Sequence, residues 1–139
     1  MFLYRHALEI YIKAILVGFG GAVVSKEEVF KRQHRLVEQL ADLNKVCASA
    51  GLQLSGNVTS MVQSWREYDP DGVSLRYPMK RAKQGASNFE RVVFLDGESF
   101  DLKRFRDAVE SVLDELDALF LDLQHEEYAD LLRSEGLSK

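Results

Sequence analysis

Apolar residues recur at intervals of three and four along most of this chain, which is the spacing of one face of an α-helix. In the first stretch these positions are Phe2, Leu8, Ile12, Ile15, Leu16 and Phe19. Glycines at 18, 20 and 21 interrupt the pattern, and each disfavours a helix interior by about 1 kcal/mol. The pattern therefore predicts a helix from about Phe2 to Val17 that ends in a turn.

A second helix is predicted to start at Ser25. Ser25 and Glu28 have the spacing of a capping box, in which each side chain satisfies a backbone amide of the other residue. The apolar period then continues to Gly51, with a break near His34. Its apolar positions are Val29, Phe30, Leu36, Val37, Leu40, Leu43, Val46 and Cys47.

Two more helices follow the same reasoning. Asn57 or Thr59 is predicted to cap a shorter helix that ends at the turn-forming residues 69–72. Ser99 or Asp101 is predicted to start the longest helix of the chain. The apolar positions of that helix reach about Arg133 and are Leu102, Phe105, Val109, Val112, Leu113, Leu116, Leu119, Phe120, Leu123, Leu131 and Leu132.

The helical period is absent between residues 73 and 100. Val73–Tyr77 and Arg91–Leu95 contain strand-favouring residues and flank a polar segment, so a two-stranded hairpin is predicted there. No repeat or linker is visible, and we therefore expect residues 1–139 to form one domain. The predicted fold class is mainly α: a helical bundle of four to five helices with a small β-hairpin insertion before the long last helix.

Composition adds limits on class and location. A chain with 46% hydrophobic and 29% charged residues is typical of a globular domain. Cys47 is the single cysteine, so it forms no internal disulfide; a reducing cytoplasm and a buried position are expected. The longest apolar run, residues 14–24, is shorter than the roughly 20 residues of a membrane span, and no membrane anchor is predicted. Because no capping residue precedes Phe2, we expect residues upstream of Met1 in the native protein.

Candidate chemistry begins in the first predicted helix. Arg5, Glu9 and Lys13 are spaced by one helical turn, so their side chains share one face beside His6. Two interpretations are open at this point. The three residues form an exposed ladder of ion pairs worth about 0.3 to 0.5 kcal/mol each, or they belong to a binding site.

Two histidines are candidates for acid–base catalysis. His34 lies among Lys31, Arg32 and Arg35, where it is either a phosphate or acid–base residue or a polar contact at the helix break. His125 precedes two glutamates in the last helix. The histidines and Cys47 do not have the spacing of a zinc site, and no phosphate-binding glycine loop or nucleophile elbow occurs. No metal and no cofactor are predicted.

Charge is unevenly distributed along the chain. The segment from Arg76 to Arg91 has five basic residues and one acidic residue, and residues 107–130 have nine acidic residues and no lysine or arginine. The candidates for phosphate contacts and base stacking in the basic segment are Arg76, Lys80, Arg81, Lys83, Arg91, Tyr77 and Phe89. The alternative is that these charges are solvated in a loop or pair with the acidic helix. A net charge of -4 excludes a non-specific polyanion binder.

Several segments resemble the HEPN superfamily of small helical domains. They are residues 5–13, His34 ahead of Leu36, Trp65, residues 75–78 and the long closing helix. Members of the superfamily occur with nucleotidyltransferases, in toxin–antitoxin pairs and in phage defence. The resemblance implies a dimeric α-helical bundle that binds nucleotide or RNA, and many members are metal-independent ribonucleases.

The ribonuclease members have an arginine followed, after four to six residues, by a histidine, and this chain lacks that pattern. The resemblance therefore implies ligand binding or fold support, without catalysis, for Arg5, Glu9, Lys13, His34, Arg76 and Tyr77, and the basic hairpin adds Arg81 and Lys83 as phosphate contacts. The preferred hypothesis is a non-catalytic HEPN-like module in the cytoplasm that forms a homodimer. Its expected partner is RNA, a nucleotide, an antitoxin or another protein.

Two alternatives belong to other functional classes. The first is a divergent ribonuclease in which His34 or His125 acts with an arginine from another helix or subunit. The second is a structural protein–protein adaptor whose acidic last helix docks a basic partner.

Overall fold

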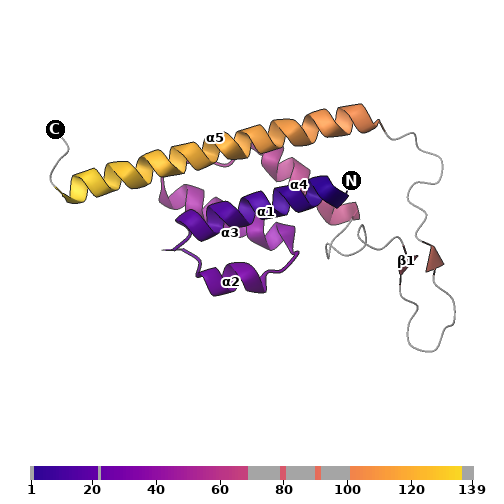
Figure 1. Cartoon of the computed structure of the whole chain (residues 1–139), viewed down its shortest axis with the longest axis horizontal. Helices are drawn as coiled ribbons and strands as arrows, with labels where there is room; N and C mark the ends of the chain where they lie inside the picture. The colour runs from indigo at the N-terminus through magenta and orange to yellow at the C-terminus, as the bar shows by residue number, and fades with distance from the viewer. Residues whose placement is uncertain (1, 22, 69–78, 81–89, 92–100, 136–139) are drawn as a thin grey trace.

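The computed structural model describes residues 2–21, 23–68, 79–80, 90–91 and 101–135, and these residues fold mainly into α-helices (Figure 1). The helices are α1 (Phe2–Phe19), α2 (Lys26–Lys31), α3 (Leu36–Ser49), α4 (Gly56–Tyr68) and α5 (Leu102–Ser134). The mainly α fold class is confirmed. The predicted break near His34 is confirmed as well, because α2 ends at Lys31 and α3 begins at Leu36.

Local chemistry explains where the helices begin and end. The Ser25 hydroxyl accepts a hydrogen bond from the Glu28 amide, and the Glu28 carboxylate accepts one from the Ser25 amide, so the predicted capping box starts α2. The Asp101 side chain caps α5 by accepting from the Arg104 amide. After α1, a Cβ atom on Gly20 would lie 2.3 Å from the Leu16 carbonyl oxygen, so only glycine fits this turn.

The start of α4 differs from the prediction. The Ser55 hydroxyl, rather than Asn57 or Thr59, accepts a hydrogen bond from the Val58 amide. Asn57 lies inside the first turn of α4, and its side-chain amide donates to Glu115 on α5 over 2.8 Å. Spacing alone did not separate these neighbouring polar residues, because all three are acceptable caps.

The core lies where α1 meets its neighbours. Helix α1 packs against α2, α3 and α5, and α4 packs against α3 and α5. In Figure 1, α5 runs along one side of the bundle, with α1 between it and the short α2. The buried core side chains include Leu8, Ile12, Ile15, Leu16, Val29, Leu43, Val46, Cys47, Val58, Val62, Trp65, Val112 and Leu116.

Aromatic side chains join the helices at both ends of this core. The rings of Phe19 and Phe120 meet edge to face at 5.1 Å between centroids, and those of Trp65 and Phe105 at 5.6 Å. Not every predicted apolar position is inside: Phe30 is 64% exposed although it fits the helical period, because α2 is only six residues long and buries Val29 alone. No helix among the described residues is both long and apolar enough to span a membrane.

The predicted β-hairpin is not confirmed. The structure describes only two-residue strands, β1 (Met79–Lys80) and β2 (Glu90–Arg91), paired antiparallel with Met79 opposite Arg91. The predicted arm Val73–Tyr77 lies outside the described residues, and so does the other arm beyond Arg91.

Candidate functional site

Two of the three charged residues predicted on one face of α1 are buried. The Arg5 Nη1 atom donates to Glu9 Oε2 at 3.1 Å, and Lys13 Nζ donates to Glu9 Oε1 at 2.6 Å. Arg5 is 2% exposed and Glu9 is 1% exposed, so the interpretation as an exposed ladder of ion pairs is wrong. Exposed pairs contribute little to stability, whereas a buried carboxylate needs partners for its charge.

The turn between α2 and α3 supplies a fourth member of this group. His34 Nδ1 lies 2.9 Å from Glu9 Oε1 and 3.1 Å from Oε2, and Arg5 Nη2 donates to the His34 carbonyl oxygen at 2.7 Å. Because an ionised carboxylate only accepts hydrogen bonds, the His34 Nδ1 atom carries the proton in this contact. We call Arg5, Glu9, Lys13 and His34 the Glu9 cluster. It connects α1 to a turn 25 residues further along the chain.

The electrostatics of Glu9 follow from this surrounding. Burial raises the pKa of Glu9, but hydrogen bonds from Lys13 and His34 and their charges lower it, and the net result is a pKa below the ordinary value. Glu9 is therefore ionised at neutral pH. It holds one negative charge against the fixed positive charges of Arg5 and Lys13.

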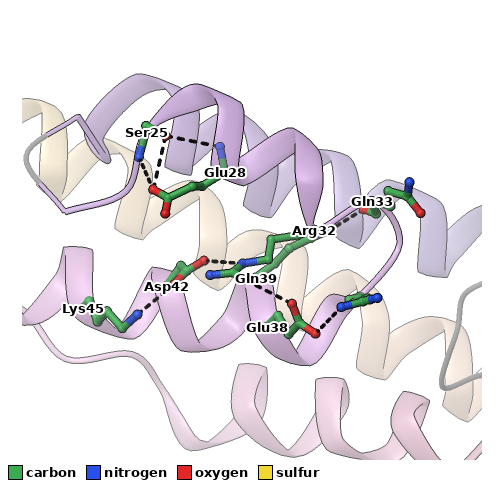
Figure 2. Close-up of polar contacts among 9 residues, drawn as sticks. Ser25, Glu28, Arg32, Gln33, Glu38, Gln39, Asp42 and Lys45 are labelled. Carbon is green, nitrogen blue, oxygen red and sulfur yellow. Dashed lines mark hydrogen bonds and ion pairs between the residues drawn. The ribbon is translucent and has the colours of Figure 1, made fainter.

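A second set of polar contacts fixes the same turn from the α3 side (Figure 2). The Arg32 guanidinium donates from Nε to Asp42 at 3.1 Å and from Nη1 to Glu38 at 3.2 Å, while Lys45 donates to Asp42 at 2.9 Å. Gln33 adopts a positive φ of 48°, and the Gln39 side chain donates to its carbonyl oxygen at 2.8 Å. Arg32 and Gln33 are thus held by side chains of α3.

Asp42 is the anchor of these contacts. It is 2% exposed; burial raises its pKa, but the hydrogen bonds from Lys45 and Arg32 lower it further, so the pKa lies below the ordinary value. The sequence interpretation missed Gln39 and Asp42. A signal was available for Gln39, which falls three positions after Leu36 and four before Leu43, on the apolar face of α3, where a buried polar residue needs an explanation. Asp42 lies at the edge of that face, three positions after Gln39 and four before Val46, and its signal in the sequence is weaker.

The accessible side of this region is basic. Within the Glu9 cluster, the side chains of Lys13 and His34 are 20% and 31% exposed. Lys31, Arg32 and Arg35 line the turn beside them, and Arg35 reaches Glu38 at 3.1 Å. We call Lys13, Lys31, Arg32, His34 and Arg35 the turn patch.

The start of α3 borders the turn patch. Arg35 is the N-cap residue of α3, and its side chain makes no capping hydrogen bond. The Leu36 amide donates to the His34 carbonyl oxygen and the Glu38 amide to that of Arg35, and the Glu38 carboxylate lies in the same turn, so the first turn of α3 is largely satisfied within the chain.

The acidic face of α5 is partly engaged by the bundle. Glu115 accepts hydrogen bonds from Ser55 and Asn57 at the start of α4, and Asp117 accepts one from the Tyr11 hydroxyl at 2.5 Å. The hydrogen bond to Asp117 and partial burial raise the pKa of Tyr11 to about 12. Carboxylates of α5 therefore help to hold α1 and α4.

The other predicted site residues lie elsewhere on α5 or outside the described residues. His125 lies on the exposed surface of α5. Four predicted phosphate contacts, Arg76, Tyr77, Arg81 and Lys83, lie outside the described residues. Among the candidates within the described ranges, the structure brings together Arg5, Glu9, Lys13 and His34, the four members of the Glu9 cluster. Searches of protein-family models, curated proteins and solved structures give no significant match to this chain.

Proposed function

We propose that this chain is a HEPN-like, non-catalytic helical module that binds the phosphate groups of RNA or of a nucleotide at the turn patch. One observation carries the proposal. The Glu9 cluster fixes Lys13 of α1 beside His34 of the α2–α3 turn, so basic side chains from two elements share one partly exposed surface.

The charge balance of this region supports an anionic ligand. Its fixed positive charges are Arg5, Lys13, Lys31, Arg32 and Arg35, and the carboxylates in contact with them are Glu9, Glu38 and Asp42. Glu28 also acts on Arg32 through its charge, so five cations stand against four carboxylates and the positive charge is in small excess. Phosphates interact with such surfaces through lysine and arginine, at affinities that depend on salt.

The internal contacts of Arg5 and Glu9 favour a non-catalytic role. Arg5 contacts the main-chain oxygen of His34 and is almost fully buried, which is the position of a residue that supports the turn. The missing arginine–histidine spacing of the ribonuclease members agrees with this assignment. Arg5 and Glu9 are thus positioning residues, and Lys13, Lys31, His34 and Arg35 are the candidates for ligand contact.

Three further parts of the proposal rest on the sequence. Arg76, Tyr77, Arg81 and Lys83 extend the ligand contacts, the chain forms a homodimer through its helices, and an antitoxin or other protein regulates it in a stress or phage-defence setting. These parts follow from the HEPN resemblance and from the basic segment.

The turn patch is tested by removing two of its exposed charges. We expect Lys31→Ala combined with Arg35→Ala to weaken binding of a fluorescein-labelled 20-nucleotide single-stranded RNA, measured by anisotropy between 50 and 200 mM salt. The slope of log affinity against log salt should fall by about 1.4, because each lost contact with a single strand removes about 0.7. A matched control, Lys103→Ala with Arg104→Ala, removes two exposed charges from α5 and should leave the slope unchanged.

Two results would contradict the proposal. Equal weakening by both double variants would show that RNA binding depends only on the net charge of the chain. An RNA affinity that neither double variant changes would show that the RNA does not bind at the turn patch. The same RNA is also examined on a denaturing gel in EDTA. Cleavage that persists in EDTA and disappears in His34→Ala would replace the non-catalytic assignment with the divergent ribonuclease.

A further inference from the structure

Helix α2 carries an exposed aromatic side chain beside the turn patch. Phe30 is 64% exposed and directly precedes Lys31, which belongs to the turn patch and is also exposed. Other residues make the apolar contacts that hold α2. Val24, just before the N-cap, and Val29, at the fourth helical position, are both buried, which is the arrangement of a hydrophobic staple. The ring of Phe30 is therefore available to a ligand.

Helix geometry shows on which side of α2 the Phe30 ring lies. Residues two apart in a helix lie about 160° apart around its axis, so Phe30 and Arg32 are on opposite sides. Arg32 keeps helical dihedral angles and reaches Asp42 on α3. The Phe30 ring therefore lies on the side of α2 away from α3. By the same rule, Lys31 faces outward, opposite the buried Val29.

Lys13 lies at the edge of α1 that borders α2. Tyr11 and Lys13 are two residues apart, so they lie about 160° apart around α1. Tyr11 contacts Asp117 on α5, so Lys13 points away from α5. Helix α2 packs against α1, and Figure 1 shows it on the side of α1 opposite α5. Phe30 thus borders the same outer surface as two lysines of the turn patch, one from α1 and one from α2.

An aromatic ring beside lysine side chains is the combination that binds single-stranded nucleic acids. Their unpaired bases stack on aromatic rings, while lysine and arginine contact the phosphates between the bases. One turn before Phe30, Lys26 and Glu27 are exposed and carry opposite charges. These two charges offset each other, so Lys13 and Lys31 determine the sign of the charge that a ligand meets beside the ring.

We propose that Phe30 stacks on an unpaired base of a single-stranded RNA whose phosphates bind at the turn patch. This inference rests on the proposed function, because the turn patch supplies the phosphate contacts. The positive charge of the region is in small excess, so phosphate contacts alone bind RNA weakly. The stacked base adds affinity and selects single strands over duplexes, whose bases remain in the helical stack.

The test measures RNA affinity after changes at Phe30 alone. The probe is the fluorescein-labelled 20-nucleotide single-stranded RNA, compared with a duplex of the same sequence. We expect Phe30→Ala to weaken single-strand binding by about fivefold to a hundredfold, the range for one stacked base, and to leave duplex affinity unchanged. Phe30→Trp should bind the single strand at least as tightly as the unmodified chain. Phe30→Leu is apolar but has no ring, and it should bind as weakly as Phe30→Ala.

A matched control removes an exposed aromatic side chain elsewhere. Tyr128 on α5 is 61% exposed, and Tyr128→Ala should leave RNA binding unchanged. Four results would each overturn the stacking contact: equal weakening by Phe30→Ala and Tyr128→Ala, unchanged single-strand affinity in Phe30→Ala, full single-strand binding by Phe30→Leu, or equal losses for single strand and duplex.

Salt dependence separates this proposal from the turn patch itself. Phe30→Ala removes no phosphate contact, so the slope of log affinity against log salt should stay unchanged. A lower slope in the Lys31 and Arg35 double variant, together with unchanged affinity in Phe30→Ala, would overturn the stacked base and leave the turn patch. An unchanged slope in the double variant, or no RNA binding by the unmodified chain, would overturn the proposed function and this inference with it.

Discussion

Replacing Glu9 with glutamine is expected to lower the free energy of unfolding at pH 7 by about 3 to 5 kcal/mol, because it removes one partner of a buried ion pair. Arg5 is 2% exposed and would keep its charge opposite a neutral amide. The contact with His34 that joins α1 to the α2–α3 turn would weaken as well. Urea unfolding followed by circular dichroism measures this loss.

The loss of stability caused by Glu9→Gln should become smaller as the pH falls. The pKa of Glu9 in the folded chain lies below its ordinary value, so its ionised form stabilises the fold above the pKa of the unfolded chain. This contribution disappears as the pH falls through the folded pKa, and the difference between the two proteins should shrink there. Glu38→Gln is the matched control, because Glu38 contacts Arg32 and Arg35 but its side chain is 39% exposed. This substitution should lower the free energy of unfolding by no more than about 1 kcal/mol. Equal effects of the two substitutions would contradict the assignment of Glu9.

Leu116→Ala should cost about 2 to 5 kcal/mol, the range for a large-to-small change in a packed core. Leu116 is fully buried on the side of α5 that faces the bundle. Leu131→Ala changes the same residue type fifteen positions later on the same helix and should stay within about 0.5 kcal/mol, because Leu131 is 52% exposed. Thermal and urea unfolding of the two variants measure the difference. A loss for Leu131→Ala as large as that for Leu116→Ala would show that the end of α5 is packed, which would contradict the exposure of Leu131.

Periodicity in the sequence was sufficient to predict most helices, because each is long enough for an apolar face to repeat several times. The cap at Ser25 and the break near His34 were predicted for the same local reasons, and Asp101 was one of the two caps predicted for α5, with Ser99 as the alternative. Periodicity alone does not show which face is covered. Leu131 and Leu132 continue the intervals of three and four, yet they lie past the end of the bundle, which a sequence pattern does not locate.

The candidate site was predicted only in its parts. Spacing placed Arg5, Glu9 and Lys13 on one face of a helix, but the burial of Arg5 and Glu9 depends on the turn around His34, a contact between distant parts of the chain. The role of Asp42 as anchor for Arg32 depends on the same turn. Long-range contacts of this kind leave no periodic signal in a single sequence. An exposed ladder of ion pairs was therefore the simpler interpretation of the charged residues on α1.

A nuclear magnetic resonance titration is the most direct test of phosphate binding at the turn patch. The single-stranded RNA 20-mer is added to 15N-labelled full-length chain, and backbone amide shifts are followed by residue. We expect the largest shifts in residues 31–38, at the α2–α3 turn and the start of α3, with further shifts near Lys13. Shifts confined to residues 76–91 or to α5, with the amide shifts of residues 31–38 unchanged at saturation, would contradict phosphate binding at the turn patch.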